Sequence, residues 1–205
     1  MRGRLITIEG IDGAGKTTLA AALKDSLQQR GRNVRLLREP GGVEVSERVR
    51  DLVKDPAVRI GGRAEALLYA AARAQLVEEA VRPLLDGGSW VLLDRFVDSS
   101  LAYQGAGRGL GVEKIRAINR FATGELDPDR TLLLQIDPTC ARARSRARLQ
   151  GLDRLEGEPE DFFIRIDRAY RELAAEDPAR IRVIDAESAP ESVLAASLQA
   201  LDGLL

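Results

Sequence analysis

The 205-residue sequence contains no histidine and a single cysteine, Cys140. Without histidine, Ser-His-Asp and Cys-His catalytic arrangements are excluded, and a zinc site lacks its usual ligands. One cysteine cannot form an intramolecular disulfide, which is typical of proteins from a reducing compartment. Apolar runs are short, and the first, at residues 5–8, ends at Glu9. Neither a signal peptide nor a membrane span is therefore expected, and we predict a cytoplasmic protein with no membrane partner.

The net charge is also close to zero, because the sequence has 31 basic and 32 acidic residues, which gives a formal net charge of −1. This balance argues against bulk attraction to nucleic acid or to an anionic membrane. Basic charge is nonetheless locally dense where arginine occupies every second position: Arg142, Arg144, Arg146 and Arg148. The length suits one α/β domain and is too short for two ordinary ones, so we expect a single domain over residues 1–205.

Apolar runs and helical patterns alternate along the whole chain. Strands are predicted at 5–8, 33–37, 90–93, 131–136 and 181–184, and those at 5–8 and 90–93 are apolar enough to be buried. Helices are predicted at 16–29, 44–54, 63–85, 112–123, 160–176 and 190–201, with a loop or short helix at 98–111. This alternation predicts a five-stranded parallel sheet covered by helices on both faces. In such a sheet, ligands bind beyond the carboxyl ends of the strands.

Residues 10–17 read G-I-D-G-A-G-K-T and fit the P-loop pattern G-x-x-x-x-G-K-[ST]. Glycines let the backbone N–H groups wrap a phosphate chain, and the following helix N-terminus favours the anion. Lys16 is expected to reach the β- and γ-phosphates, and the Thr17 hydroxyl to ligate Mg²⁺. A Gly-rich turn that binds nothing is the alternative, but the loop joins a strand-like run to a helix-like run. The sequence thus predicts a P-loop NTPase-type fold whose ATP site uses Gly10, Ile11, Asp12, Gly13, Ala14, Gly15, Lys16, Thr17 and Thr18.

Charged residues follow two other predicted strands. Asp94 closes the run at 90–93 and is expected to help hold Mg²⁺, directly or through water. A helix cap or a salt bridge to Arg95 is the competing interpretation of Asp94. Arg38 and Arg95 follow different strands, so both can converge on a second phosphate through bidentate hydrogen bonds. The alternative for each arginine is a solvated place on the surface.

The arginine-rich segment at 139–154 has three interpretations. If it is helical, Arg142 and Arg146 share a face while Arg144 and Arg148 point elsewhere, so one triphosphate cannot engage all four. Two or three of them could close over the transferring phosphoryl group as a short mobile lid. A solvated basic helix is the second interpretation. An RNA-binding patch is the third, but no aromatic residue lies between 139 and 150 for stacking.

Tyr69 and Arg73 lie four residues apart, and therefore on one helical face. A ring beside a guanidinium can stack a base and hydrogen-bond its edge, although a core tyrosine with a snorkelling arginine is the more ordinary arrangement. Residues 99–105, S-S-L-A-Y-Q-G, add hydroxyls and an amide that could read a pyrimidine edge.

Taken together, these residues resemble the thymidylate kinase family of P-loop nucleoside monophosphate kinases over essentially the whole chain. The resemblance is carried by E-G-I-D-G-A-G-K-T-T at 9–18, R-E-P-G-G at 38–42, Y-A-A-A-R at 69–73, D-R-F at 94–96 and A-Y-Q-G-A-G-R-G at 102–109. The last motif, at this distance after D-R-F, is the most specific. The family transfers the γ-phosphoryl group of ATP to dTMP with Mg²⁺ and is usually dimeric. The resemblance therefore implies ATP, dTMP and Mg²⁺ as ligands and a homodimer, and the balanced net charge predicts no nucleic-acid partner.

The resemblance also implies roles for individual residues. The dTMP site would comprise Arg38, Glu39, Tyr69, Arg73, Arg95, Ser99, Ser100, Tyr103 and Gln104. Among these, Arg38 and Arg95 would hold the phosphate. The thymine edge would meet Arg73, Ser100 and Gln104, and Tyr103 would favour deoxyribose. The catalytic set would be Lys16, Arg95, Asp12, Arg146 and Arg148, with Arg144 on the ATP side and Thr17 and Asp94 at the metal.

Three features distinguish this chain within the resemblance. Gly13 and Ala14 leave the P-loop without an arginine, so the catalytic positive charge must come from the lid, as in bacterial members. Tyr69 stands where phenylalanine is usual, and Val43 where threonine is common. A kinase for another nucleoside monophosphate remains an alternative. A P-loop switch or nucleotide-dependent binding module is another, although the N-K-x-D tetrapeptide typical of guanine recognition is absent.

Overall fold

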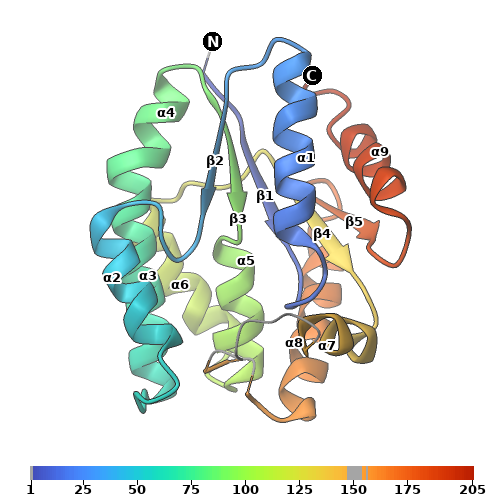
Figure 1. Ribbon diagram of the computed structural model, residues 1–205. Coiled ribbons are helices and arrows are strands. Elements are labelled where there is room, and N and C mark those ends of the chain that lie inside the picture. Colours follow the sequence, from blue (N-terminus) through green and yellow to red (C-terminus); the bar gives the residue numbers. More distant parts are fainter. Residues whose placement is uncertain (1, 147–153, 156) are drawn as a thin grey trace.

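The computed structural model describes residues 2–146, 154–155 and 157–205 (Figure 1). One sheet contains β1 (Leu5–Glu9), β2 (Val34–Arg38), β3 (Trp90–Asp94), β4 (Arg130–Gln135) and β5 (Ile181–Asp185). The strands are all parallel, in the order β2-β3-β1-β4-β5. The predicted parallel sheet is confirmed, and each strand lies within one residue of its predicted ends.

The helices are α1 (Lys16–Gln29), α2 (Glu44–Lys54), α3 (Gly62–Leu76), α4 (Arg82–Asp86), α5 (Val97–Ser100), α6 (Val112–Thr123), α7 (Pro138–Arg146), α8 (Glu160–Glu176) and α9 (Pro190–Ala200). A π-helical segment, η1 (Val77–Val81), joins α3 to α4, so the helix predicted at 63–85 forms but is not regular throughout. A second one, η2 (Leu101–Gly107), continues α5. The segment at 98–111 is therefore largely helical rather than a loop.

Alternate side chains of β1 point to opposite faces of the sheet, as the two-residue period of a strand requires. Ile6 and Ile8 belong to the apolar cluster that contains Leu23 of α1. Leu5 belongs to a separate cluster with Leu76 and Leu85, on the α3–α4 side. Helix α1 lies beside α9 in front of the sheet in Figure 1. Both faces are thus covered, which buries the three central strands, β3, β1 and β4, and leaves the carboxyl ends of the strands for ligands.

The carboxyl ends of β1, β2 and β3 meet at one edge of the sheet. Asp94 lies opposite Ile8 on one side and Arg38 on the other. The P-loop begins directly after β1, and Arg95 directly after β3. The fold therefore brings together residues that are 85 positions apart in the chain (Gly10 and Arg95), at 3.2 Å between the Gly10 carbonyl oxygen and Arg95 Nη1. No helix in the described ranges is long and apolar enough to cross a bilayer.

Candidate active site

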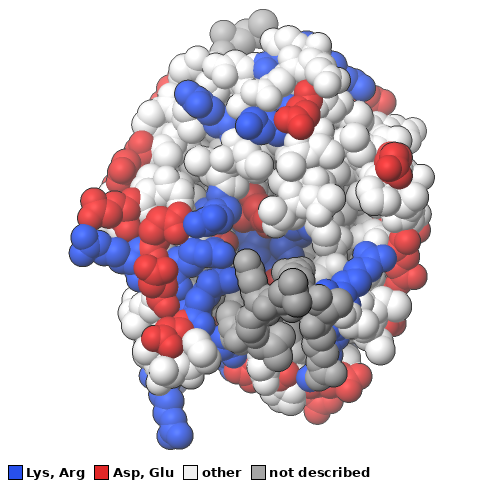
Figure 2. Space-filling view, viewed as in Figure 1, with Lys and Arg blue, Asp and Glu red and all other residues white. Residues whose placement is uncertain are grey.

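A cavity of about 810 Å³ opens at this edge of the sheet. Figure 2 shows lysine and arginine side chains gathered around a hollow in this face of the molecule. The predicted site residues that line the cavity are Asp12, Gly13, Gly15, Lys16, Thr17, Thr18, Arg38, Glu39, Tyr69, Arg73, Asp94, Arg95, Ser99, Ser100, Tyr103 and Gln104. Gly10, Ile11 and Ala14 are buried within the loop and do not line it. One continuous space therefore joins the P-loop to both groups of residues predicted for the acceptor.

The P-loop turns back on itself at glycines in the left-handed region of backbone space. Gly13 has φ +88° and Gly15 φ +92°, which L side chains rarely adopt. Lys16 lies inside the turn and donates to the carbonyl oxygens of Gly10 and Ile11 at 3.0 and 2.9 Å. Burial, helped by the charge of Arg95, lowers the pKa of Lys16 to about 8 against the opposing effect of nearby carboxylates. The ammonium group thus remains mostly charged at neutral pH and close to the cavity.

Thr17 and Asp94, the two predicted metal ligands, lie side by side. The Thr17 hydroxyl donates to Asp94 Oδ2 at 2.9 Å. Hydroxyl and carboxylate oxygens are the hard ligands that Mg²⁺ prefers, and in kinases they are completed by water and substrate phosphates. The described residues contain no group of three or more histidine, cysteine, aspartate or glutamate side chains that could hold a metal alone. The donor set therefore fits Mg²⁺ shared with a nucleotide rather than an all-protein metal cage.

Arg95 is held by the P-loop and by η2. It has φ +72°, an uncommon conformation for a residue with a side chain. Its Nη2 atom lies 2.5 Å from Asp12 Oδ1, and its Nη1 atom donates to Ser99 Oγ at 3.1 Å. The Tyr103 hydroxyl donates to the other Asp12 oxygen at 2.9 Å. Burial raises the pKa of Asp12, but Arg95, Lys16 and the Tyr103 hydrogen bond outweigh it and hold that pKa well below its ordinary value. Asp12 is therefore an ionised carboxylate, and it positions Arg95 by accepting its hydrogen bond.

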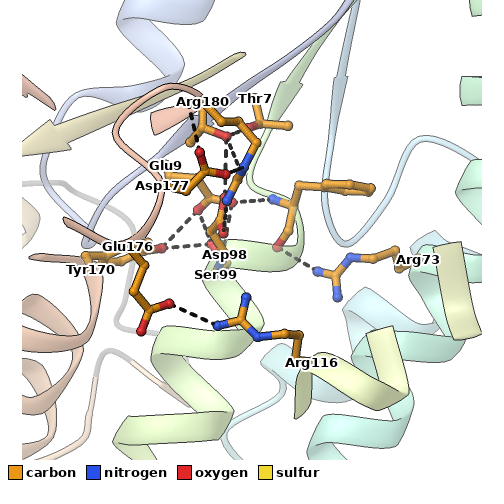
Figure 3. A network of polar contacts seen from close by, with 12 residues as sticks. Thr7, Glu9, Arg73, Asp98, Ser99, Arg116, Tyr170, Glu176, Asp177 and Arg180 are labelled. Atoms are coloured by element: carbon orange, nitrogen blue, oxygen red, sulfur yellow. Dashed lines mark hydrogen bonds and ion pairs between the residues drawn. The ribbon is translucent and has the colours of Figure 1, made fainter. Parts of the chain in front are cut away.

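Glu9, which sequence reasoning left without a role, supports the turn that carries Arg95 (Figure 3). Its Oε1 atom accepts from the backbone N–H groups of Phe96 and Ser99 at 2.7 and 3.2 Å. Its Oε2 atom accepts from the Ser99 hydroxyl at 2.6 Å and the Tyr170 hydroxyl at 2.9 Å. Burial, followed by the charge of Asp98, raises the pKa of Glu9 to about 7. The sequence feature that could have identified Glu9 as a site residue is its position at the end of a strand, which it shares with Asp94.

Arg73 is 2% exposed and lies between the cavity and a buried set of acceptors. Its Nε atom donates to Glu39 Oε2 at 2.7 Å, and Nη1 donates to the Ser100 hydroxyl at 3.0 Å. Nη1 also donates to the Asn119 amide oxygen, and Nη2 to the Phe96 carbonyl oxygen at 2.9 Å. Sequence reasoning missed Asn119, which carries no motif. Arg73 therefore joins α3, α5 and α6 behind the predicted base site.

Two predicted arginines lie toward the outside. Arg38 forms an exposed ion pair with Glu47 Oε2 at 3.0 Å, so it is the least constrained of the acceptor-site arginines. Arg144, on α7, donates to the Ala186 carbonyl oxygen at 3.0 Å, in the loop that follows β5. The side chain of Arg146 and the whole of Arg148 lie outside the described residues. Their predicted lid roles therefore remain predictions.

A P-loop at the head of a parallel sheet, opening on a cavity with arginines from neighbouring strands, defines a P-loop NTPase-type phosphotransferase fold. A profile of the thymidylate kinase family matches residues 8–196. The chain is 46% identical to a thymidylate kinase of Lactobacillus delbrueckii subsp. bulgaricus over 97% of this chain and 95% of that protein. It is 45% identical to a thymidylate kinase of Rhizorhabdus wittichii over the full length of both. The crystal structure of thymidylate kinase from Ehrlichia chaffeensis superposes with a TM-score of 0.79 and 28% identity, over 98% of this chain and 100% of that one.

The match to the family profile and the full-length relatives agree with the fold. This protein belongs to the thymidylate kinase family.

Proposed function

We propose that this protein transfers the γ-phosphoryl group of ATP to dTMP, giving dTDP, in a Mg²⁺-dependent reaction. The observation that carries the proposal is that one cavity joins the P-loop to Arg38 and Arg95 and then to Tyr69 and Gln104. These three regions suit, in order, a phosphoryl donor, an acceptor phosphate and a pyrimidine base. The names of the relatives, all thymidylate kinases, support the same substrate.

Catalysis in this proposal is alignment and charge neutralisation. The acceptor phosphate oxygen is already anionic at neutral pH, so no strong general base is needed and the absence of histidine is no obstacle. Lys16 and the loop N–H groups hold the donor phosphates, while Arg95, oriented by Asp12, binds the acceptor phosphate. Thr17 and Asp94 would hold Mg²⁺, which neutralises charge on the β- and γ-phosphates when bound.

The lid contributes the remaining positive charge. We propose that Arg146 and Arg148 stabilise the transferring group, and that Arg144 lies on the nucleotide side, where it already meets the loop after β5. Arg146→Ala and Arg148→Ala are expected to lower kcat more than they weaken dTMP binding. An effect on KM alone would contradict this role.

Phosphoryl transfer should be assayed with ATP and Mg²⁺ against dTMP, dUMP, dCMP, AMP and GMP. We expect dTMP to have the highest kcat/KM. A different preferred acceptor would support a kinase for another nucleoside monophosphate, and no transfer to any acceptor would favour the switch or binding module. Lys16→Met is the control: it should abolish transfer while leaving the far-ultraviolet circular dichroism spectrum unchanged.

We further propose a homodimer that buries α3 with its neighbours α2 and α6. Large apolar side chains are exposed on these helices, and Phe121 of α6 is 91% exposed and Leu67 of α3 is 57% exposed. Exposed apolar patches of this kind mark interaction surfaces. Phe121→Asp should yield a monomer by light scattering after gel filtration, whereas Ile164→Asp on α8 should not. The single domain over 1–205 and the cytoplasmic location stay predictions.

A further inference from the structure

Glu65 is a buried carboxylate of α3 that none of the sequence motifs includes. Its side chain is fully buried and begins one helical turn before Tyr69. The Gln104 amide nitrogen, Nε2, donates to Glu65 Oε1 at 2.9 Å. The residue predicted to read the base edge is therefore held from behind by an acidic side chain.

The side chains of Gln104, Arg108 and Arg154 surround this carboxylate and keep it charged. Arg108 donates to Oε2 through Nη2 at 3.0 Å and to Oε1 through Nε at 3.2 Å. Arg154 Nη2 lies 2.7 Å from Oε2, and Glu158 pairs with the far side of Arg108 at 2.6 Å. Burial raises the pKa of Glu65, but the hydrogen bonds from Arg108, Gln104 and Arg154 outweigh it and lower the pKa below its ordinary value. Glu65 is therefore ionised at neutral pH.

An ionised carboxylate can only accept hydrogen bonds, and this fixes the Gln104 amide. The NH₂ group must face Glu65, so the carbonyl oxygen lies on the opposite side of the amide plane. Gln104 lines the cavity, and within the described residues its amide oxygen has no hydrogen-bond partner. With the amide nitrogen turned toward Glu65, Gln104 offers the cavity its amide oxygen, which can only accept a hydrogen bond.

We propose that Glu65 determines base specificity by fixing the orientation of the Gln104 amide. An acceptor-only carbonyl pairs with the ring N–H at position 3 of thymine or uracil. Cytosine presents a lone pair at the same position, which would face the carbonyl oxygen without a proton between them and leave both acceptors unpaired. This inference rests on the proposed function, because it requires a pyrimidine nucleotide in the cavity.

The test compares kcat/KM for dTMP, dUMP and dCMP in the wild type and in Glu65→Gln. Glutamine both donates and accepts, so the Gln104 amide is free to turn over. We expect kcat/KM to fall about tenfold for dTMP and dUMP alike, mainly through KM, with their ratio unchanged. The dTMP/dCMP ratio should fall by about tenfold or more, because the turned amide can donate to cytosine.

Three controls separate orientation from general damage. Glu158→Gln removes a carboxylate that pairs with Arg108 but does not touch Gln104, and it should leave all ratios unchanged. Glu65→Asp keeps an acceptor-only group and should keep the dTMP/dCMP ratio even if activity falls. In a Gln104→Ala background, Glu65→Gln should change that ratio no further. Thermal unfolding followed by circular dichroism establishes that each variant is folded.

An equal loss with all three nucleotides, at an unchanged dTMP/dCMP ratio, would show that Glu65 is merely structural and overturn the inference. If Glu65→Gln does not fold, a folded Glu65→Asp that loses the ratio would overturn it instead. A wild-type protein that does not phosphorylate dTMP overturns the proposed function, which is a separate result.

Discussion

Replacing Glu9 by glutamine is expected to change the stability of the protein by an amount that depends on pH. The unfolding free energy of the variant, relative to that of the wild type, should be higher at pH 8 than at pH 5. Glu9 is fully buried and accepts from two backbone N–H groups and the hydroxyls of Ser99 and Tyr170. Glutamine keeps an oxygen for the two N–H groups, and its NH₂ group can donate to hydroxyls that rotate. The substitution therefore removes the charge with little change of shape.

The magnitude follows from the pKa of Glu9, which burial and then Asp98 raise from an ordinary 4.5 to about 7 in the folded protein. Because the folded pKa is the higher one, the folded state binds this proton more tightly than the unfolded state. Its stabilising contribution is complete below about pH 4.5 and is lost as the pH rises through 7. One proton over this interval corresponds to about 3 kcal/mol. Glutamine does not titrate, so its contribution is constant.

Urea unfolding at pH values from 4.5 to 8 measures this difference. The unfolding free energy of Glu9→Gln minus that of the wild type should rise by about 3 kcal/mol across the range, with m-values unchanged. Glu47→Gln is the control, because hydrogen bonds from Gly42 and Arg38 lower the pKa of Glu47. Its contribution is lost only as the pH falls below 4.5, so its difference should stay flat. A flat difference for Glu9→Gln as well would refute the reasoning.

Three further substitutions test the contacts around the cavity. Gly13→Ala should lower the unfolding free energy and the ATP affinity more than Gly31→Ala does. Both glycines have a positive φ, which costs an alanine about 1–2 kcal/mol of strain, but only at Gly13 would a Cβ also meet the backbone of α7. Arg73→Met should cost about 3–5 kcal/mol in urea unfolding by leaving Glu39 buried and unpaired, and adding Glu39→Gln should restore part of this. Asp94→Asn should raise the Mg²⁺ concentration for half-maximal activity by about tenfold, whereas an unchanged requirement would remove Asp94 from the metal site.

The strands and the P-loop were predictable because their signals are local. A short apolar run followed by a glycine-rich turn specifies a buried strand and a phosphate loop without knowledge of the rest of the chain. The strand ends then place Asp94 and Arg95 near Lys16 as a consequence of parallel topology. Those predictions needed only the alternation of strands and helices, and the structure brings the side chains together as expected.

The residues that were missed act through contacts that are distant in the chain. Asn119 meets Arg73 across 46 positions, and Tyr170 meets Glu9 across 161. Neither partner has a periodic or motif signal, since each requires only one polar atom at one point of the folded structure. Glu65, which was also missed, is an intermediate case, because a residue four positions before Tyr69 lies on the same helical face as the predicted base-stacking ring. The spacing predicts the helical face on which Glu65 lies, but its hydrogen bond to Gln104 depends on how η2 packs against α3.

The absence of an arginine from the P-loop has a steric reason in this structure. A Cβ at Gly13 would lie 2.1 Å from the Ala141 carbonyl oxygen, so the first turns of α7 occupy the space above the loop. Any side chain at Gly13 would displace α7, and with it Arg144 from the loop after β5. The glycine of the loop and helix α7 therefore form one packing arrangement: the helix that excludes a side chain from Gly13 ends at Arg146, one of the two arginines proposed to supply the missing charge. Gly13→Arg should therefore fail to restore activity to a variant with Arg146→Ala and Arg148→Ala, because the new side chain can be accommodated only by displacing α7.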